Sequence, residues 1–382
     1  MFQIGTAKYG VRNADGTLNE ERVRELSAIP QVRMFEVKLT QGAKPGKGGI
    51  LPGIKVTSEI AEIRGIPAGQ DLNSPNRHPE INSNAELLDF IARIKALSGK
   101  PVGIKAVIGA YGWIDELMAM INARGDRPDF FTLDSGDGGT GAAPMALIDN
   151  VGLPIRESLP LLRDIIDKHG LGERIPIIAS GKLTTPADVA WALCAGATFV
   201  NSARGFMFAL GCIQSLKFNR NTCPTGITTH DKRLQMGLDP TEKSVRVANY
   251  CANVKHDVET IAHSCGVPIP DAFGACTSAL SARTAPLDRW TSCTRRTPPE
   301  TANHRWAKRS AAIQPPTAMN PMNGGPSSTA SGITVSVNIA STAPAANARI
   351  TGASAAAAPR IKLPAAALMP IRTGMPAQIA KM

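Results

Sequence analysis

The run Phe130-Phe-Thr-Leu-Asp134 continues directly into Ser135-Gly-Asp-Gly-Gly-Thr-Gly-Ala-Ala-Pro144, and this stretch decides the fold. A second stretch of the same kind is Ala197-Thr-Phe-Val200 followed by Asn201-Ser-Ala-Arg-Gly205. Each is a short apolar strand that enters a glycine-containing loop, and the loop leads toward a helix. Because glycine tolerates positive φ and has no Cβ, backbone N–H groups in such loops can close on an anion or a flat ring. Two such units in series predict a (β/α) barrel with a phosphorylated cofactor at its C-terminal face.

Strands and helices alternate strictly from the N-terminus to about residue 202. Short apolar runs predict six strands, at 2–5, 34–40, 101–108, 130–134, 176–180 and 199–202. Apolar periodicity and capping residues predict helices at 19–28, 84–97, 114–123, 157–169 and 186–195. Strands that are buried on both faces look like this, so a parallel sheet covered by helices is indicated. We therefore expect an α/β protein of the (β/α)₈ TIM-barrel type, incomplete, with about six of the eight β/α units.

The composition favours one globular unit and argues against nucleic-acid binding. The chain has 382 residues, of which 43% are apolar, and this is ample for one large core. The net charge is +11, but residues 287–382 hold 11 Lys and Arg and only two acids, so +9 lies there. Residues 1–286 are nearly neutral and have no basic stripe, whereas nucleic-acid binding needs clustered phosphate contacts.

The last part of the chain has a different composition. After about residue 286, Pro, Ala, Ser, Thr and Arg dominate, periodicity is lost, and no acid follows Glu300. Such a segment buries too little apolar surface to offset the entropy of ordering. We expect a barrel domain over residues 1–270 and a disordered, low-complexity tail over residues 271–382. Translation of an out-of-frame stretch is the alternative origin of this tail.

Cysteine usage and the absence of long apolar runs indicate a cytoplasmic protein. Seven cysteines, an odd number, are scattered over a chain much longer than disulfide-stapled scaffolds. The N-terminus has no basic region followed by an apolar one, and no stretch approaches the roughly 18 apolar residues of a membrane span. We expect a reducing compartment and no membrane partner.

Five segments between Phe35 and about Val267 have long or unusual sequences. They are Glu36-Val-Lys-Leu-Thr-Gln-Gly-Ala-Lys-Pro-Gly-Lys-Gly-Gly49, Leu51-Pro-Gly53, Glu59-Ile-Ala-Glu-Ile-Arg64, Ser135 to Pro144, and Cys212 through Cys223-Pro-Thr-Gly-Ile-Thr-Thr229. Together they resemble the FMN-binding synthase domain of glutamate synthase, in particular its stand-alone bacterial and archaeal-type members. The resemblance implies a (β/α)₈ barrel that carries FMN. It also implies reductive amination, in which ammonia and 2-oxoglutarate form 2-iminoglutarate and reduced FMN delivers the hydride that yields L-glutamate.

The resemblance gives Lys38 and Lys44 catalytic roles and assigns Gln41 and Arg64 to substrate binding. Lys38, Gln41 and Lys44 form a K-x-x-Q-x-x-K set at the end of a predicted strand, and strand ends in such a barrel face the active site. A dicarboxylate needs cations, an imine accepts hydride more readily beside positive charge, and the arginine fork suits a carboxylate. The alternative is that Lys38 points into solvent and the loop merely turns.

The resemblance also assigns residues to the cofactor. Lys105 would stabilise negative charge on the reduced flavin near N1 and O2, with a structural ion pair as the alternative for this lysine in an apolar strand. The glycine-rich loop would lie against the flavin or the substrate through Gly136, Asp137, Gly138, Gly139 and Thr140. The FMN phosphate would bind after the last two strands, where (β/α)₈ proteins have their common phosphate site. The residues there are Gly181, Lys182, Ser202, Arg204 and Gly205, with a surface ion pair as the alternative for Arg204.

One position departs from the family pattern. The family has three cysteines spaced C-x₅-C-x₄-C that ligate a [3Fe–4S] cluster, whereas this chain has Cys212 and Cys223 with Phe218 between them. Phenylalanine cannot donate to iron, so the two cysteines are the remnant of a ligand set and a bound cluster is doubtful. A third thiolate would have to come from another cysteine that folding brings close.

The resemblance implies 2-oxoglutarate and ammonia, free or derived from glutamine, as small-molecule partners, and an electron-donor protein or subunit. The family's first two strands have no match here, so a truncated relative without catalysis is one alternative. Another is a different FMN barrel enzyme such as a 2-hydroxy-acid oxidase, which needs a catalytic histidine after a strand. His78 and His230 lie in predicted loops, and a surface histidine is the favoured interpretation of His78.

Overall fold

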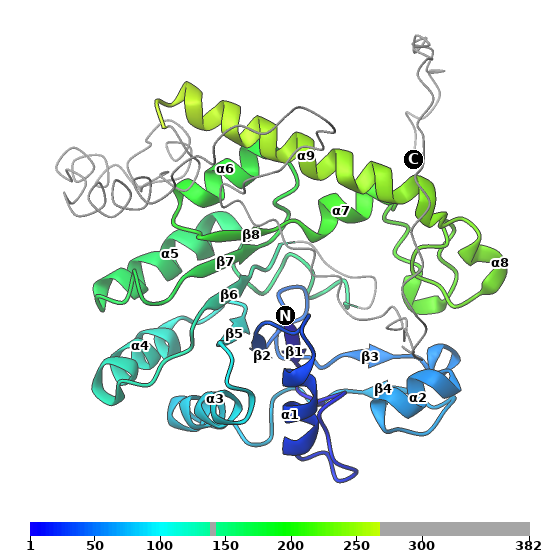
Figure 1. Cartoon of the computed structure of the whole chain (residues 1–382), viewed down its shortest axis with the longest axis horizontal. Helices are drawn as coiled ribbons and strands as arrows, with labels where there is room; N and C mark the ends of the chain where they lie inside the picture. The colour runs from blue at the N-terminus through cyan, green and yellow to red at the C-terminus, as the bar shows by residue number, and fades with distance from the viewer. Residues whose placement is uncertain (138–142, 268–382) are drawn as a thin grey trace, which may run out of the picture. The chain divides into compact units, whose positions relative to one another are not determined.

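The computed structural model describes residues 1–137 and 143–267, and a six-stranded parallel sheet is its central element. The strand order is β1-β2-β5-β6-β7-β8, and helices follow the strands along the chain (Figure 1). The strands are β1 (Phe2–Ile4), β2 (Phe35–Lys38), β5 (Val102–Ala106), β6 (Phe131–Asp134), β7 (Ile177–Ser180) and β8 (Phe199–Asn201). The expected α/β barrel-type fold with six β/α units is confirmed, and no pairing joins β8 back to β1 within the described residues. The predictions for residues 271–382 and for Gly138, Gly139 and Thr140 fall outside those residues.

The helices flank the strands much as the periodicity predicts. They are α1 (Glu20–Ala28), α3 (Asn84–Ser98), α4 (Gly112–Arg124), α5 (Ile155–Lys168) and α6 (Pro186–Cys194). Side-chain capping fixes several of their ends: the hydroxyl of Ser83 accepts the N–H of Glu86 at the start of α3, and Thr185 and Asp188 form a capping box at α6. Each cap of this kind contributes about 1 kcal/mol, so the helix starts are set locally.

The two faces of the sheet have opposite chemistry. Residues such as Val37, Ile104 and Leu133 are fully buried and belong to one core with apolar residues of α3, α4, α5 and α6. The alternate residues are polar: parallel pairing sets Lys38 beside Lys105 and Lys105 beside Thr132. Because side chains alternate along a strand, the apolar set holds the helices and leaves the polar set on the opposite face.

A small unit interrupts the alternation between β2 and β5. Two short antiparallel strands, β3 (Ile50–Leu51) and β4 (Leu72–Asn73), enclose a turn of 3₁₀ helix (Gly53–Lys55) and α2 (Ser58–Arg64). Its apolar residues form a cluster separate from the main core. The sequence predicts only a glycine-rich loop from 41 to 53, because strands of two residues carry no detectable period.

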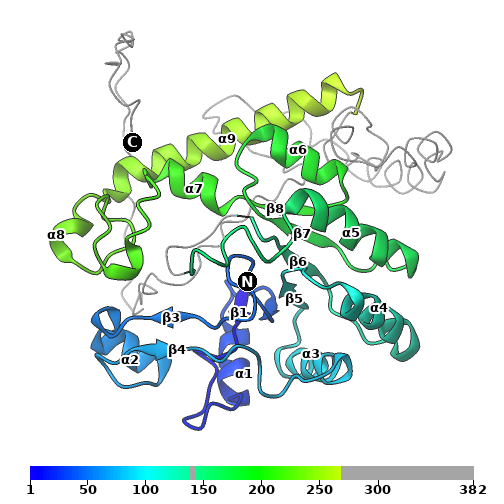
Figure 2. The ribbon, with the colours of Figure 1, turned by 180° about the vertical axis from the view of Figure 1, so that it is seen from behind.

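A long helix lies at the C-terminal end of the described part of the chain. This helix, α9 (Pro240–Ser264), has 25 residues and packs against α6 and α7 (Ala203–Ala209), as Figures 1 and 2 show. The short helix α8 (Lys232–Gln235) precedes it. Tyr250 of α9 bridges the end of the sheet: its hydroxyl lies 2.7 Å from the Ser202 hydroxyl and donates to the carbonyl of Thr184 at 2.8 Å. Within residues 1–137 and 143–267, no helix combines the length and the hydropathy of a membrane span.

Gly103→Ala is expected to destabilise the fold by about 1–3 kcal/mol, the usual cost of overpacking. Gly103 lies in β5, and a Cβ there would come within 2.3 Å of the Phe130 ring, which is buried. The control is Gly5→Ala, because a Cβ at Gly5 meets no atom within 4 Å. Urea unfolding of the two variants checks this, and equal midpoints would contradict the packing described here.

Candidate functional site

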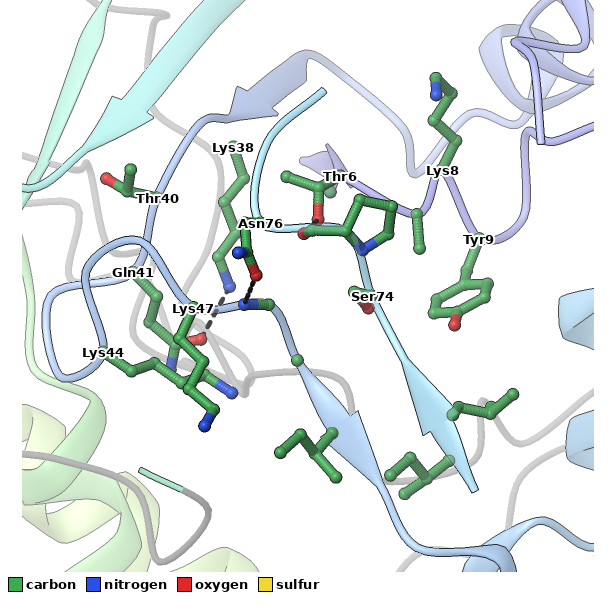
Figure 3. Close-up of a pocket in the computed structure, with 18 of the residues that line it drawn as sticks. Thr6, Lys8, Tyr9, Lys38, Thr40, Gln41, Lys44, Lys47, Ser74 and Asn76 are labelled. Atoms are coloured by element: carbon green, nitrogen blue, oxygen red, sulfur yellow. Dashed lines mark hydrogen bonds between the residues drawn. The ribbon is translucent and has the colours of Figure 1, made fainter. Parts of the chain in front are cut away.

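A cavity of about 270 Å³ opens where β1 and β2 end, and the β3–β4 unit forms its far wall. Lys38, Gln41, Lys44 and Arg64 all line it, although α2 carries Arg64 far along the chain from β2. Figure 3 shows Lys38 extending from the end of β2 toward Gln41, with Lys44 and Lys47 beside it. The structure therefore brings together the four residues that the sequence assigns to catalysis and substrate binding, and it contradicts the solvent-pointing alternative for Lys38.

The charged residues that line the cavity are all cationic, although Lys8 is paired with Glu80 outside the lining at 2.9 Å. The cationic lining residues are Lys8, Lys38, Lys44, Lys47, Lys55 and Arg64, and no Asp or Glu is among the described residues that line the cavity. Partial burial strengthens the attraction of such a set for an anion, because water screens the charges less. The cavity is thus suited to a small molecule with more than one negative group.

Lys38 lies at the centre of this charge. Its Nζ donates a hydrogen bond of 3.1 Å to Oε1 of Gln41. Burial, followed by the positive charges of Lys105 and Lys44, lowers the pKa of Lys38 to about 8, although Asp134 opposes this shift. A lysine with this pKa is mostly protonated at pH 7 and can still exchange a proton near neutrality.

The carboxylate of Asp134 ties the loop after β2 to the sheet. Its Oδ2 lies 3.6 Å from Nζ of Lys105 and accepts the N–H of Gly42 at 3.0 Å. Gly42 passes so close to β6 that a Cβ would lie 1.8 Å from the carbonyl oxygen of Ser135, and only glycine fits this approach. Lys105 thus has the ion pair that was the alternative to a flavin contact, and it lies beside Lys38 in the sheet.

Lys44 and Arg64 approach the cavity from different elements. Lys44 is 5% exposed, and burial followed by the charge of Lys47 lowers its pKa. The guanidinium of Arg64 lies 4.9 Å from the centre of the Tyr9 ring, a cation–π distance, and burial lowers its pKa. Tyr9 follows β1 and is a site residue that the sequence does not reveal, because a single tyrosine in a loop has no distinguishing pattern.

His78 positions the end of β2. It is 1% exposed, and its Nε2 donates to the backbone carbonyl of Lys38 at 3.1 Å. Burial lowers the pKa of His78 to about 4, so the ring is neutral at pH 7. The interpretation as a surface histidine is wrong: the loop from β4 folds back against β2 and encloses the ring, which also contacts Phe90 at 5.7 Å.

The loops after β6 and β7 meet at the same end of the sheet. A Cβ on Gly181 would lie 1.9 Å from the Ser135 hydroxyl, so these two loops are in contact. Asp137 accepts the N–H of Ile155 and lies 3.2 Å from the hydroxyl of Ser135, which gives it a local structural role. Gly136 donates its N–H to Leu153 at 2.8 Å. The described residues of these loops are therefore held by contacts with one another and with the start of α5.

The predicted phosphate residues are only partly brought together. Gly205 and Ser202 lie side by side under Tyr250, whose hydroxyl would be 1.8 Å from a Cβ on Gly205. Lys182 instead forms an ion pair of 3.1 Å with Asp149 and is exposed. The Arg204 side chain, in the first turn of α7, makes no ion pair or hydrogen bond with another described residue, so the surface ion pair considered for it is not found there.

The segment from Cys212 to Cys223 does not present an iron–sulfur ligand set. Sγ of Cys212 accepts the N–H of Gln214 at 3.5 Å, and Sγ of Cys223 lies 3.4 Å from the Thr225 hydroxyl. Burial raises the pKa of Cys223, but hydrogen bonds with Thr225 and Thr228 outweigh it and bring the pKa to about 7. No group of three or more His, Cys, Asp or Glu side chains suited to a metal occurs in residues 1–137 and 143–267.

Lys105→Met is expected to raise the pKa of Lys38 above about 8, because it removes a like charge that penalises the protonated form. NMR titration of ¹³C-dimethylated lysines measures this pKa directly. Lys168→Met is the control, since Lys168 is exposed on α5 and pairs with Asp115. An unchanged Lys38 titration in Lys105→Met would show that the two ammonium groups are not coupled.

Comparison with known proteins identifies relatives over the described part of the chain. A family model described as the conserved region in glutamate synthase matches residues 1–268. The chain is 43% identical over 273 residues to the glutamate synthase large subunit-like protein YerD of Bacillus subtilis, an alignment that covers 72% of this chain and 52% of that protein. It is 36% identical over 271 residues to the archaeal glutamate synthase [NADPH] of Methanocaldococcus jannaschii. That alignment covers 70% of this chain and 49% of the archaeal protein. The chain thus spans about half the length of these relatives.

Among solved structures, a flavocytochrome b2 variant with sulfite bound is similar with a TM-score of 0.41 and 16% identity. That likeness covers 84% of this chain and 61% of the other.

Proposed function

The chain belongs to the glutamate synthase family, and from this premise we propose that it is an FMN-dependent oxidoreductase that converts 2-oxoglutarate and ammonia into L-glutamate through 2-iminoglutarate. The observation that carries the proposal is the convergence of Lys38, Gln41, Lys44 and Arg64 on one cavity without acidic lining residues. We assign the catalytic unit to residues 1–270 and the tail to residues 271–382.

The polar face of the sheet fits a flat, anionic cofactor. Thr132 and Glu36 each have a buried oxygen without a partner among the described residues, namely Oγ1 and Oε2. Lys105 lies beside Thr132 in the register, so a cation and a hydroxyl face the same side. Gly181, Ser202 and Gly205 lie beyond the strand ends, where the first turn of α7 leaves N–H groups without intrahelical partners. We propose that FMN is held between these two groups of residues.

The cavity residues bind and orient the substrate. Arg64 offers two parallel N–H donors to one carboxylate, and its stacking on Tyr9 restricts its rotation. Lys44, which is almost fully buried, is placed to neutralise the second carboxylate. Gln41 is held by Lys38 and can hydrogen-bond the carbonyl oxygen that amination removes. Such a set favours a short dicarboxylate over a monocarboxylate, because an unpaired buried ammonium is costly.

Lys38 is the proton donor for imine formation. FMN, when bound, supplies the hydride for reduction of the imine carbon. The Lys38 ammonium can donate a proton to the hydroxyl that leaves C2 as water when the imine forms. The charges of Lys38 and Lys44 also stabilise the carboxylate beside C2 while the carbon gains electrons. The pKa of about 8 suits this role, because the proton is present at pH 7 and is readily transferred.

Partners complete the reaction. We propose that ammonia arrives free or from glutamine hydrolysis by another protein, and that an electron-donor protein or subunit in the cytoplasm reduces the flavin. The relative from Methanocaldococcus jannaschii is named for NADPH, and it is about twice as long as the matched region. No observation favours a hydroxy-acid oxidase, since His78 is buried against Lys38 and is not among the described residues that line the cationic cavity.

The first test is retention of FMN by the full chain after gel filtration, followed by formation of glutamate from 2-oxoglutarate and ammonia with dithionite as reductant. Lys44→Met is expected to lower kcat/KM for 2-oxoglutarate by roughly 10- to 100-fold, because a hydrogen bond to a charged group contributes about 1.5–3 kcal/mol. Lys168→Met is the control with unchanged kinetics. A chain that retains no flavin would favour the truncated relative without catalysis.

The second test is the pH dependence of kcat/KM. Because Lys38 is protonated below its pKa of about 8, activity is expected to fall as pH rises through that value. Lys38→Arg keeps the charge at all these pH values, so the descending limb near pH 8 should vanish while kcat drops. A limb that persists unchanged in Lys38→Arg would assign the titration to another group.

A further inference from the structure

A buried lysine holds the segment that, in the family, carries the iron–sulfur ligands. Lys55 is 2% exposed and ends the 3₁₀ turn after β3. Its Nζ donates to the carbonyl of Phe218 at 2.8 Å and to the carbonyl of Thr228 at 3.0 Å. It also lies 6.0 Å from the centre of the Phe218 ring. One ammonium group thus joins the β3–β4 unit to two points of a segment more than 160 residues away.

These contacts account for the burial of the charge. An ammonium removed from water needs acceptors in fixed positions, and two carbonyl oxygens with an aromatic face provide them. Burial lowers the pKa of Lys55, while the nearby Cys223 opposes this shift. The two carbonyls flank Cys223 in the sequence, at residues 218 and 228, so the contacts close a loop around that cysteine.

The same segment lacks the donor set for a cluster. Phe218 occupies the middle ligand position, where it starts a turn of 3₁₀ helix (Phe218–Arg220). Cys212 and Cys223 are engaged with Gln214 and Thr225. A [3Fe–4S] cluster needs thiolate ligands, and two cysteines with a phenylalanine do not supply three.

We propose that Lys55 anchors the segment from Cys212 to Thr228, and that this segment keeps its position with no iron–sulfur cluster bound. The anchor is a set of hydrogen bonds to backbone carbonyls and therefore needs no metal. Phe218 and Asn219 line the cavity, so the anchor also fixes one wall of it. Only the identity of the molecule in that cavity rests on the function proposed above; the anchor itself does not.

Metal content tests the first half of the proposal. The full chain is purified anaerobically, incubated with ferrous iron and sulfide, passed through gel filtration, and analysed for iron and acid-labile sulfide. We expect less than about one iron per chain and no broad absorbance near 400 nm, because the thiolate set is incomplete. Retention of about three irons per chain with matching sulfide would overturn the proposal. This measurement requires no variant and no enzymatic activity.

Limited proteolysis tests the second half. Lys217 and Arg220 are exposed trypsin sites on either side of Phe218, within the anchored segment. Lys55→Met is expected to raise the initial rate of cleavage at these two sites by roughly tenfold, because cleavage follows the population of the opened segment. Lys47→Met is the matched control, because Lys47 lines the same cavity but its side chain forms no hydrogen bond or ion pair with the described residues of the segment.

Mass spectrometry of the fragments distinguishes local opening from general unfolding. Faster cleavage confined to Lys217 and Arg220 supports the anchor. Cleavage rates at these sites equal to those of the unmodified chain would overturn it. If Lys55→Met fails to fold, Lys55→Gln is compared in the same assay, and cleavage rates equal to those of the unmodified chain there overturn the anchor. Failure to form glutamate in the assays above would refute the proposed function without affecting either result.

Discussion

The carboxylate of Asp134 is the contact on which the arrangement of the site depends. It lies 3.6 Å from the Lys105 ammonium and accepts the N–H of Gly42, so it joins β5, β6 and the loop after β2 at one point. It also opposes the fall in the pKa of Lys38. Lys38, Lys44 and Lys105 would repel each other without a counter-charge, and Asp134, which is not among the lining residues, supplies one. The position of the loop that carries Gln41 and Lys44 depends on that attachment.

The cavity combines elements that serve different purposes. The parallel sheet provides a rigid edge, since its apolar face is fully packed under the helices. The β3–β4 unit has a small core of its own and brings Arg64 and Lys55 to the opposite wall. His78 and Lys55 then attach the loops to each other through backbone carbonyls. Buried side chains that hydrogen-bond carbonyls give precise positions to flexible segments, and this explains how long loops form a defined cavity.

Most strands and helices, and four residues of the cavity, could be predicted from the sequence, and the features that could not be predicted have physical causes. The six strands and five helices have apolar periods or caps that local sequence determines, and Lys38, Gln41, Lys44 and Arg64 were expected at one site. The β3–β4 strands are too short to show a period. Lys182 pairs with Asp149, so its role at a phosphate stays a prediction, and the contact of Tyr250 from the distant helix α9 with Gly205 is not foreseen. Such partners are separated by many residues, so no spacing rule reveals them.

The amino-acid sequence by itself determined the alternation of strands and helices, the identity of the cationic residues after β2, and the phenylalanine at position 218 between Cys212 and Cys223. Each of these follows from residue types within a few positions of one another. Tertiary structure alone decided which charges are buried and what they contact: Lys55 between two carbonyls, His78 against the end of β2, and Arg64 over Tyr9. Burial and long-range pairing depend on packing between distant segments, because they are properties of the folded chain as a whole.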